Sequence, residues 1–389
     1  MNVLHAISSL DPSAGGPPLV ALHLAAAEAA LGCRTRILSY QVPNAADDAN
    51  RPALRRDGAV PVDLQLLAAP GACERVLALG ARRQCVRWLR QADLLHLHGV
   101  WDPMLLHVAR AAQAMGVRYC VTPHGMLDVW QLQQKRLKKQ LALSLGYRQM
   151  LDRAAFVHFL NPDEARLAAP LGLSSRVQVI PNGVSLEELR PLPPRGAFRA
   201  QHPELADCPV VLFLGRLHHK KGLDYLADAF AILLATQPRA RLVVAGPDGG
   251  ARAAFEAQLL RLGIAARVLL VGPLYAEQKL QALADCDCFC LPSRQEGFSL
   301  AITEALACGV PVVISEPCHF PEVAEVGAGI VTPLDASLIA AALALILSDR
   351  TAAARMGEQG RQLVAARYTW RIVAERMVTA YRSAVGDAQ

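Results

Sequence analysis

The chain of 389 residues contains 53% hydrophobic and 19% charged residues and carries a formal net charge of +6. This length favours two domains, and the apolar content excludes a disordered chain, which could not bury enough surface to offset the entropy of ordering. The longest uncharged apolar stretch, 338–347, is about half of what a membrane span requires, and the N-terminus shows no basic leader. A cytoplasmic protein is therefore expected, with peripheral association at the inner face of the membrane left open.

The positive charge is unevenly distributed. Two clusters lie in the first half of the chain: Arg82, Arg83, Arg87 and Arg90, and Lys135, Arg136, Lys138 and Lys139. Solvated helix faces are one interpretation, and attraction to an anionic membrane surface or a pyrophosphate-bearing acceptor is the other. Nucleic acid is not an expected partner, because no aromatic platform or reading motif accompanies these charges. The ten scattered cysteines lack zinc-type spacing, so reduced thiols are expected, with metal or redox use as the alternative.

In chain order, apolar strands alternate with helices in the first half. A helix is expected over 17–31, and strands over 2–7, 34–39, 94–97, 118–121, 155–159 and 177–180. Asn161-Pro162-Asp163-Glu164 indicates a helix start, with an Asn cap, Pro at the first position and Glu at the third.

The alternation fails over 185–207, where four prolines predict a linker. It restarts with strands over 210–214, 242–245, 268–271, 288–291 and 312–314. We therefore expect domains over 1–184 and 208–368, and a C-terminal segment, 369–389, whose helix is a candidate to pack back on the first domain. Each domain is predicted to be a parallel α/β sheet covered by helices, with ligands at the carboxyl ends of its strands, so a cleft between the domains is the expected site.

A basic loop, Gly215-Arg216-Leu217-His218-His219-Lys220-Lys221-Gly222, follows the strand over 210–214. Gly215 permits a tight turn, and Gly222 lets a helix begin close to a bound group. Arg216 and Lys221 would then face one spot, an arrangement suited to a diphosphate. A solvated basic loop is the alternative.

Two glutamates follow the strand over 288–291, namely Glu296 in a loop and Glu304 inside a helix expected to begin near Phe298. The loop carboxylate can accept hydrogen bonds from sugar hydroxyls, and the helical one can hold a ribose diol. Free N–H groups of Phe298 to Leu300 can bind phosphate oxygens. Two unrelated surface glutamates are the alternative, but the turn and strand of Gly309-Val310-Pro311-Val312 complete an ordered unit.

These motifs, Gly215-Arg216, Lys221-Gly222, Glu296-Gly297-Phe298, Glu304-Ala305 and Gly309-Val310-Pro311-Val312, together resemble the donor domain of family 4 retaining glycosyltransferases, also called group 1 glycosyl transferases, of the bacterial surface- or exopolysaccharide type. The resemblance implies the GT-B fold, with two Rossmann-like domains facing a central cleft. It implies catalytic roles for His124, Arg216, Lys221 and Glu296. It implies donor contacts for Gly15, Gly16, Gly215, Arg216, Lys221, Pro273, Leu274, Glu296, Gly297, Phe298, Ser299, Leu300 and Glu304.

In the first domain, Ala14-Gly15-Gly16 would lie beneath the donor sugar, and His124 in Pro123-His124-Gly125-Met126 against the transferred sugar. His96 and His98 alternate on one strand, where acceptor contact and a structural role both stay open. Candidate acceptor contacts are His98, Trp101, Trp130, Lys135 and Arg136, the last three near an amphipathic helix expected within 130–150. Asn182-Gly183 is a turn that we interpret as architectural.

The resemblance implies transfer of a hexose-type sugar from a UDP- or GDP-sugar to a hydroxyl of a glycan or lipid-linked oligosaccharide, in bacterial polysaccharide biosynthesis. It further implies retention of configuration by a front-face route, and no metal or other cofactor. A nucleotide-sugar epimerase and an inactive nucleotide-sugar-binding protein are the alternatives. A nicotinamide-dependent oxidoreductase is disfavoured, because no Gly-x-Gly-x-x-Gly follows a strand.

Overall fold

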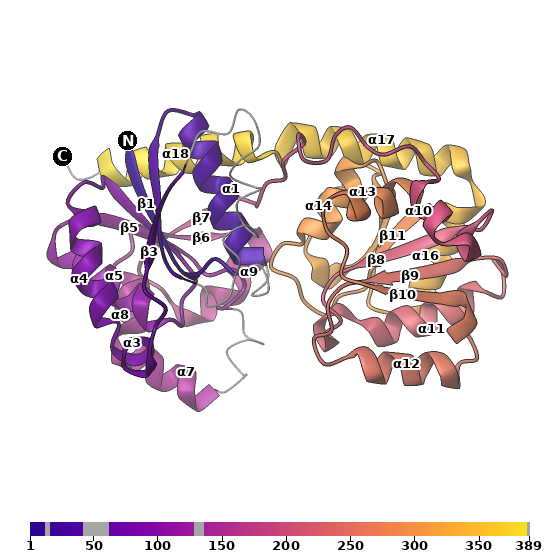
Figure 1. Ribbon diagram of the computed structural model, residues 1–389, viewed down its shortest axis with the longest axis horizontal. Coiled ribbons are helices and arrows are strands. Elements are labelled where there is room, and N and C mark those ends of the chain that lie inside the picture. The colour runs from indigo at the N-terminus through magenta and orange to yellow at the C-terminus, as the bar shows by residue number, and fades with distance from the viewer. Residues whose placement is uncertain (12–15, 42–61, 128–135, 387–389) are drawn as a thin grey trace. The chain divides into compact units, whose positions relative to one another are not determined.

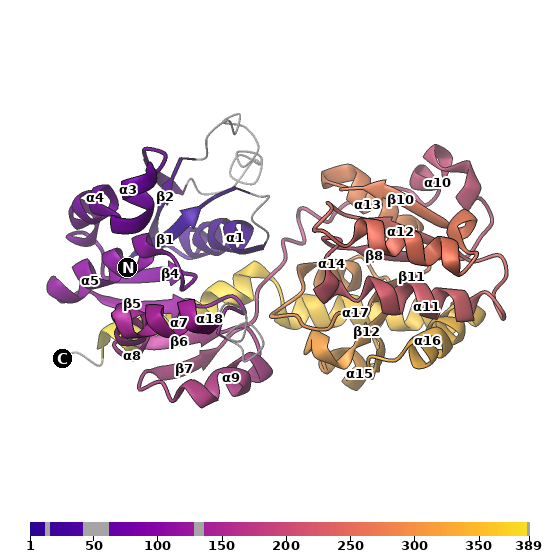
Figure 2. The same cartoon turned by 90° about the horizontal axis from the view of Figure 1, so that it is seen from below.

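The computed structural model describes residues 1–11, 16–41, 62–127 and 136–386. It divides into two compact units, Met1–Gly183 with Trp370–Gln389, and Val184–Thr369. Each unit contains one parallel sheet covered by helices on both faces (Figures 1 and 2). The expected α/β class with two doubly wound sheets is confirmed.

The first unit has a seven-stranded sheet of order β3-β2-β1-β4-β5-β6-β7. Its strands are β1 (Asn2–Ser9), β2 (Arg34–Tyr40), β3 (Asp63–Leu67), β4 (Leu94–His98), β5 (Arg118–Thr122), β6 (Phe156–Phe159) and β7 (Arg176–Val179). Its helices are α1 (Gly16–Ala30), α3 (Ala72–Leu77), α4 (Leu79–Leu89), α5 (Pro103–Ala114), α7 (Arg136–Ala142), the π-helix η2 (Leu143–Tyr147), α8 (Arg148–Asp152), α9 (Pro162–Ala168), the 3₁₀ turn η3 (Ala169–Leu171) and α18 (Trp370–Gly386). The edge strand β3 was not predicted, although Leu64 and Leu66 alternate with Asp63 and Gln65; the run is short, and only Leu67 of its five residues is buried.

The second unit has a six-stranded sheet of order β10-β9-β8-β11-β12-β13. Its strands are β8 (Val210–Leu214), β9 (Arg241–Ala245), β10 (Val268–Gly272), β11 (Cys288–Leu291), β12 (Val312–Ser315) and β13 (Gly329–Thr332). Its helices are α10 (Ala197–Gln201), α11 (Leu223–Leu233), α12 (Arg252–Arg261), α13 (Ala276–Asp285), α14 (Leu300–Ala307), α15 (Glu322–Glu325), α16 (Ala336–Ser348) and α17 (Arg350–Arg367), with 3₁₀ turns η4 (Pro203–Leu205), η5 (His219–Lys221), η6 (Ala265–Arg267) and η7 (Glu316–Cys318). The unpredicted β13 is a four-residue edge strand, too short for a periodic signal.

The proline-rich segment 185–207 carries α10 and η4 and is part of the second unit. A single buried carboxylate holds it, because Asp285 accepts hydrogen bonds from the amides of Gly196, Phe198 and Arg199. The three amides lie at the start of α10, where a helix has N–H groups without helical partners.

The C-terminal helix α18 packs against α1 within the first unit. The side chain of Tyr381 is fully buried there, and its hydroxyl contacts Glu28 of α1 and His96 of β4. At the start of α18, Gly183 touches Trp370 so closely that a Cβ on Gly183 would lie 2.7 Å from the Trp370 backbone. The Asn182-Gly183 turn therefore has a packing requirement for glycine.

In the part of the chain that the structure describes, no single helix is long and apolar enough to span a membrane. The pair α16 and α17 passes that test only when taken together, across a bend of 103°.

We expect Gly183→Ala to destabilise the first unit by about 1–3 kcal/mol, because the added methyl group has no space beside Trp370. Trp88, Trp101 and Trp370 belong to this unit, and the second unit, Val184–Thr369, contains no tryptophan, so urea unfolding followed by tryptophan fluorescence reports on the first unit. Gly71→Ala is the matched control, since a Cβ on Gly71 meets nothing within 4 Å. Equal stabilities of the two variants would contradict the packing argument.

Candidate active site

The loops that follow β8 and β11 meet at the point where the strand order of the second unit reverses. Strands β9 and β10 lie on one side of β8, and β12 and β13 lie beyond β11. Such a switch point is where open α/β sheets bind ligands. Gly222 has a φ of 65°, and a Cβ there would overlap the carbonyl oxygen of Pro292. The glycine thus lets the two loops touch through their backbones.

An ion pair joins these loops. The ammonium group of Lys221 lies 2.6 Å from Oε1 of Glu296, and the Ser293 hydroxyl donates to the same oxygen at 2.5 Å. The Glu296 side chain is 9% exposed and that of Lys221 is 23% exposed, so the pair is largely shielded but open to one side. Two residues predicted to bind the donor, from loops 75 positions apart, are therefore brought together.

Arg294 braces the same loops, and sequence reasoning missed it. Its guanidinium forms two hydrogen bonds to Asp224, at 2.7 and 2.5 Å, and stacks over the Tyr225 ring at 4.8 Å. Its amide donates to the Lys220 carbonyl at 2.6 Å. Burial would raise the pKa of Asp224, but the hydrogen bond and charge of Arg294 outweigh it and lower that pKa. Asp224 and Arg294 are 70 positions apart, so their spacing in the sequence did not indicate that they form an ion pair.

Arg216 lies exposed at the end of β8 beside a loop that the sequence did not single out. The amide of Leu217 donates to Pro247, and the amide of Gly249 donates back to Leu217, each at 2.9 Å. A Cβ on Gly249 would lie 2.8 Å from Cγ of Arg216. Glycine at this position therefore makes room for the stem of the predicted diphosphate-binding arginine.

Glu304 is also paired, again with a residue that was not predicted. Its Oε1 lies 2.7 Å from the ammonium group of Lys279 on α13, with side-chain exposures of 20% and 27%. Burial opposes the charge of Lys279, but Glu304 outweighs it and raises the pKa of this lysine. A ribose diol at Glu304 would therefore meet a carboxylate whose charge is already balanced.

The start of α14 corrects one expectation. The helix begins at Leu300 with Ser299 as its cap, two residues later than expected, and the Ser299 side chain forms no capping hydrogen bond. The amides suited to an anion are thus those of the first turn from Leu300 onward. The Phe298 ring instead packs on Phe320 and Tyr368, with ring centroids 5.6 and 5.8 Å away.

The remaining predicted donor residues are placed as follows. Pro273 is exposed and Leu274 half-buried directly after β10, and Gly16 is the first, exposed residue of α1. Gly15, Trp130 and Lys135 lie outside the described residues, as does the side chain of Arg136.

In the first unit, His124 follows β5 in a strained loop. Its φ is 52°, a conformation uncommon for a residue other than glycine. Glu164 holds this loop, since its buried carboxylate accepts from the amides of Gly125 at 2.6 Å and Leu160 at 2.7 Å. Asn161 caps the helix that carries Glu164, at 2.7 Å, so the capping motif of the sequence is confirmed. The side chain of Glu164, the last residue of that motif, accepts a hydrogen bond from the amide of Gly125, in the loop that carries His124.

His98 contacts His124 but not the surface. Its Nδ1 lies 3.2 Å from Nε2 of His124, and its Nε2 lies 3.0 Å from Nδ1 of His5. With 3% exposure, His98 can influence a substrate only through its neighbours. Trp101, the other described candidate for the acceptor, donates from Nε1 to the Met126 carbonyl at 3.3 Å.

Burial lowers the pKa of the histidines around this loop. The pKa is about 3 for His124 and about 4 for His158, and it lies well below the usual value for His96 and His98, where neighbouring histidines add to the effect of burial. These imidazoles are neutral at physiological pH. They can exchange hydrogen bonds with a sugar but cannot supply positive charge to a diphosphate.

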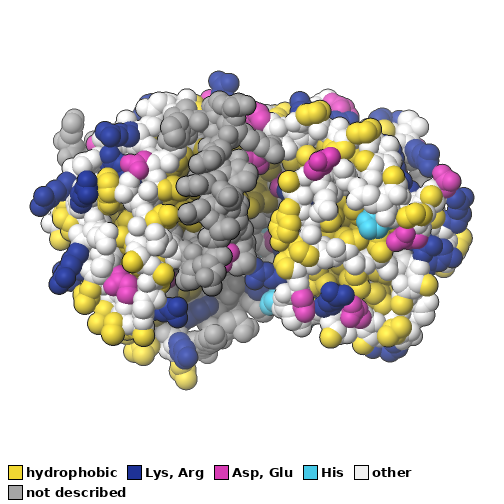
Figure 3. Space-filling view, viewed as in Figure 1, with side chains coloured by type: hydrophobic (Ala, Val, Ile, Leu, Met, Phe, Trp, Pro, Cys, Tyr) yellow, Lys and Arg dark blue, Asp and Glu magenta, His cyan; other side chains and the backbone are white. Residues whose placement is uncertain are grey.

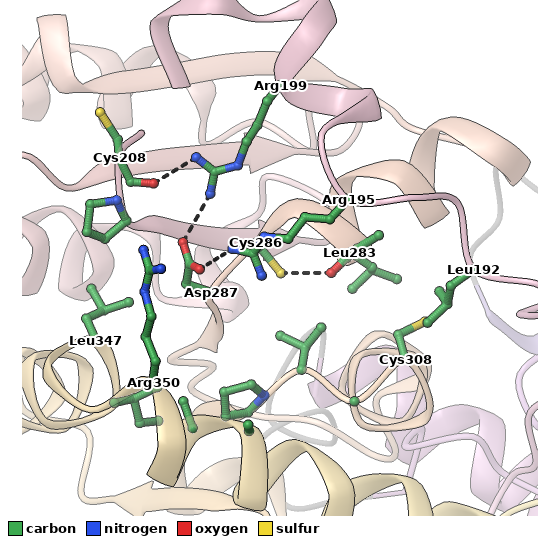
Figure 4. Close-up of a pocket in the computed structure, with 18 of the residues that line it drawn as sticks. Leu192, Arg195, Arg199, Cys208, Leu283, Cys286, Asp287, Cys308, Leu347 and Arg350 are labelled. Atoms are coloured by element: carbon green, nitrogen blue, oxygen red, sulfur yellow. Dashed lines mark hydrogen bonds and ion pairs between the residues drawn. The ribbon is translucent and has the colours of Figure 1, made fainter. Parts of the chain in front are cut away.

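A pocket of about 760 Å³ lies at the amino ends of β8, β11 and β12, and is therefore distinct from the loops described above. Figure 4 shows Arg195, Arg199 and Arg350 around it, with the first two joined to Asp287. Because Arg195 and Arg199 both pair with Asp287, we interpret the charged lining of this pocket as a structural ion-pair network.

The comparisons with known proteins agree with this geometry. The family model for glycosyl transferases group 1 matches residues 194–363, and that for the glycosyl transferase 4-like domain matches 15–183. A D-inositol 3-phosphate glycosyltransferase of Thermobispora bispora is 32% identical over 75% of this chain and 71% of its own length. A GDP-mannose-dependent monoacylated alpha-(1-6)-phosphatidylinositol monomannoside mannosyltransferase of Corynebacterium glutamicum is 29% identical over 73% of this chain and 75% of its own.

Solved structures show the same fold. Sucrose-phosphate synthase of Thermosynechococcus elongatus has a TM-score of 0.77 at 23% identity, covering all of both chains. Anabaena HepE, in complex with UDP and glucose, has a TM-score of 0.78 at 20% identity, covering 98% of this chain and all of its own. The fold and its loops thus define a glycosyltransferase that uses a nucleotide sugar. The chain belongs to the group 1, or family 4, glycosyltransferases, as its motifs predicted.

We expect the first unit to lose stability as pH falls from about 6.5 toward 4. The folded-state pKa values of His96, His98, His124 and His158 are lowered, so the unfolded chain binds more protons in this range. Each such proton contributes a slope of about 1.4 kcal/mol per pH unit. Urea unfolding monitored by tryptophan fluorescence measures this slope. A stability independent of pH in this range would contradict the neutral cluster.

Proposed function

We propose that this glycosyltransferase moves a hexose-type sugar from UDP-sugar or GDP-sugar to a hydroxyl of a glycan or lipid-linked acceptor, with retention of configuration and without a metal ion. The observation that carries the proposal is the Lys221–Glu296 pair at the switch point of the second unit's sheet. It offers a cation for phosphate and an anion for sugar hydroxyls side by side.

The second unit would hold the nucleoside diphosphate. Arg216 and Lys221 contribute two positive charges from either end of one loop, and the first turn of α14 adds amides aimed at an anion. Glu304, balanced by Lys279, is suited to accept hydrogen bonds from ribose hydroxyls. Two fixed cations can take over the charge neutralisation that a divalent ion provides elsewhere.

The chemistry would be a front-face displacement. The bond between the anomeric carbon and the leaving phosphate oxygen breaks, the acceptor hydroxyl bonds to the same face, and the departing phosphate oxygen takes its proton. Glu296 is a poor nucleophile for a double displacement, because it already accepts from Lys221 and Ser293. The protein's contribution is then positioning and electrostatic stabilisation. His124, as a neutral imidazole, would bind a hydroxyl of the transferred sugar.

Relatives guide the choice of donor and acceptor. The mannosyltransferase of Corynebacterium glutamicum is described as GDP-mannose-dependent and as acting on a phosphatidylinositol mannoside, whereas HepE was solved with UDP. Both bases therefore belong in the test. A lipid-linked acceptor in bacterial polysaccharide assembly is the acceptor class that we propose.

A surface on the first unit supports a lipid-linked acceptor. Leu137, Leu141 and Leu145 recur every fourth residue along α7 and η2 and are 81%, 60% and 61% exposed. Lys138 is exposed beside them. At the edge of the first unit where Figure 1 places α7, Figure 3 shows basic side chains next to hydrophobic ones. Exposed leucines flanked by cations are typical of helices that dock on anionic membranes.

We expect Lys221→Ala to reduce turnover by about 100-fold or more, because it removes a charge that stabilises the leaving diphosphate. Lys220→Ala is the control, since it removes the same charge from the same turn but its ammonium group binds Gln295 instead. A thermal-shift screen with UDP and GDP, with EDTA present, first identifies the base; product formation from the matching nucleotide sugars follows.

Wild-type turnover by Lys221→Ala, or activity abolished by EDTA, would contradict this site. Conversion of the donor in the absence of acceptor would indicate an epimerase.

We expect the wild-type protein to co-sediment with phosphatidylglycerol vesicles at low salt, and Leu137→Glu with Leu141→Glu to abolish this binding by placing carboxylates at the surface. Leu260→Glu is the matched control, because Leu260 is 71% exposed on α12 of the other unit. Failure of the wild-type protein to sediment would favour a water-soluble acceptor.

A further inference from the structure

A continuous run of hydrogen bonds crosses the core of the first unit and ends at His124. It joins side chains of β1, α1, β4, β5, β6 and α18, and two directly bonded residues, Glu28 and Tyr381, are 353 positions apart in the sequence. The contacts are Ile180 O–His158 Nε2 (2.7 Å), His158 Nδ1–Thr122 Oγ1 (2.7 Å), Thr122 Oγ1–His96 Nε2 (2.6 Å), His96 Nδ1–Tyr381 Oη (2.6 Å), Tyr381 Oη–Glu28 Oε1 (2.9 Å), Glu28 Oε2–His5 Nε2 (2.8 Å), His5 Nδ1–His98 Nε2 (3.0 Å) and His98 Nδ1–His124 Nε2 (3.2 Å). We refer to these nine groups as the histidine chain.

One end of the histidine chain has a fixed direction. The carbonyl of Ile180 can only accept, so Nε2 of His158 carries a proton. Because burial leaves His158 neutral, with a pKa of about 4, its Nδ1 must accept from the Thr122 hydroxyl. Thr122 has then used its only proton and must accept from Nε2–H of His96.

The hydrogen bonds in the middle of the histidine chain depend on which partner receives the phenol proton of Tyr381. Tyr381 contacts both His96 and Glu28, but it has a single proton to donate. If that proton goes to His96, Glu28 must be a neutral acid that donates from Oε1; if it goes to Glu28, His96 must be an imidazolium. The pKa of His96 lies well below its usual value, because of burial first and neighbouring histidines second, and this disfavours an imidazolium at His96. In both arrangements Oε2 of Glu28 accepts.

The direction of the other half follows from that oxygen. Nε2 of His5 donates to Glu28. When the His5 ring carries one proton, its Nδ1 must accept from Nε2–H of His98, whereas a ring with two protons would donate and reverse the direction. Nδ1 of His98 in turn accepts from Nε2–H of His124. With one proton on each ring, every imidazole of this half donates in the same direction.

A metal-binding site explains the arrangement of these residues less well than a chain of hydrogen bonds does. His5, His96 and His98 have ring nitrogens within 4.8 Å of one another and could by distance hold an ion. The two ring nitrogens of each already have hydrogen-bonding partners, however, and an ion would displace at least the His5–His98 contact.

We propose that the histidine chain holds His124 as the Nε2–H tautomer and leaves its Nδ1 as a hydrogen-bond acceptor, with Glu28 as the remote positioning residue. This inference rests on the proposed function in one respect, that His124 meets the transferred sugar. It then specifies the chemistry of that contact: His124 accepts from a sugar hydroxyl and does not donate to one.

The test compares two substitutions of Glu28. The amide of Glu28→Gln can reproduce the neutral acid, donating to Tyr381 and accepting from His5. Glu28→Met has similar volume but can do neither, so both directions of the His5–His98–His124 segment become available. Tyr119→Phe is the control, because it removes a buried hydroxyl of the same unit that is bonded to Gln113 and Met150, outside the histidine chain.

Long-range ¹H–¹⁵N correlation spectra of the histidine rings at pH 7 give the tautomer of His124, and kinetics give kcat and KM for the donor. We expect the Nε2–H tautomer with wild-type kinetics in Glu28→Gln and Tyr119→Phe. In Glu28→Met we expect mixed tautomers and a kcat lowered by about 10-fold or more, with a smaller change in KM.

The wild-type spectrum alone can overturn the proposal, even if Glu28→Met does not fold: an Nδ1–H tautomer or an imidazolium at His124 would contradict it. So would a folded Glu28→Met protein that keeps the tautomer, or a Glu28→Gln protein as impaired as Glu28→Met. Stoichiometric Zn²⁺ binding that shifts the resonances of His5, His96 and His98 would replace it by a metal site. If no nucleotide sugar is turned over, the proposed function fails, while the spectrum still tests the histidine chain.

Discussion

The backbone contact between Gly222 and Pro292 is the constraint on which the donor loops depend. Parallel strands bring their carboxyl ends to one edge of the sheet, where neighbouring strands lie about 4.8 Å apart. With no Cβ at Gly222, the loops touch, and the Lys221–Glu296 pair can form at 2.6 Å across them. The Lys221–Glu296 ion pair therefore depends on the absence of a side chain at Gly222, the residue that follows Lys221.

Much of this could be predicted from the sequence, because it depends on local rules. The strands over 210–214 and 288–291 were predicted with the bounds that the structure has, since short apolar runs bounded by turns are strong signals. The edge strands β3 and β13 were missed, because both are short and only partly buried, and a run of four or five residues carries a weak signal. The start of α14 was placed two residues early for a related reason: the Phe298 side chain is apolar but packs outside the helix, in an aromatic cluster.

What the sequence could not supply are partners distant in the chain. Lys279 and Arg294 were not recognised, since their roles depend on Glu304 and Asp224, 25 and 70 positions away. Gly249 was not singled out in the sequence, yet it matters because it accommodates the stem of Arg216. A sequence motif shows which charged residues lie close together in the chain. Only the folded sheet shows which charged residues from different motifs pair with each other.

The two units differ in where they place ionisable side chains. In the second unit, the Lys221–Glu296 and Lys279–Glu304 pairs form at 2.6 and 2.7 Å and remain partly exposed, which suits an anionic ligand that must bind and leave. In the first unit, burial lowers the pKa of His96, His98, His124 and His158, and hydrogen bonds between side chains connect these rings with His5, Glu28 and Tyr381. A buried polar network is stable only if every member is satisfied, and a fixed direction of donation satisfies each link of this one. The C-terminal helix is part of that condition, because Tyr381 of α18 is the link between Glu28 and His96. Its return to the first unit therefore completes the hydrogen bonding of the core as well as its apolar packing.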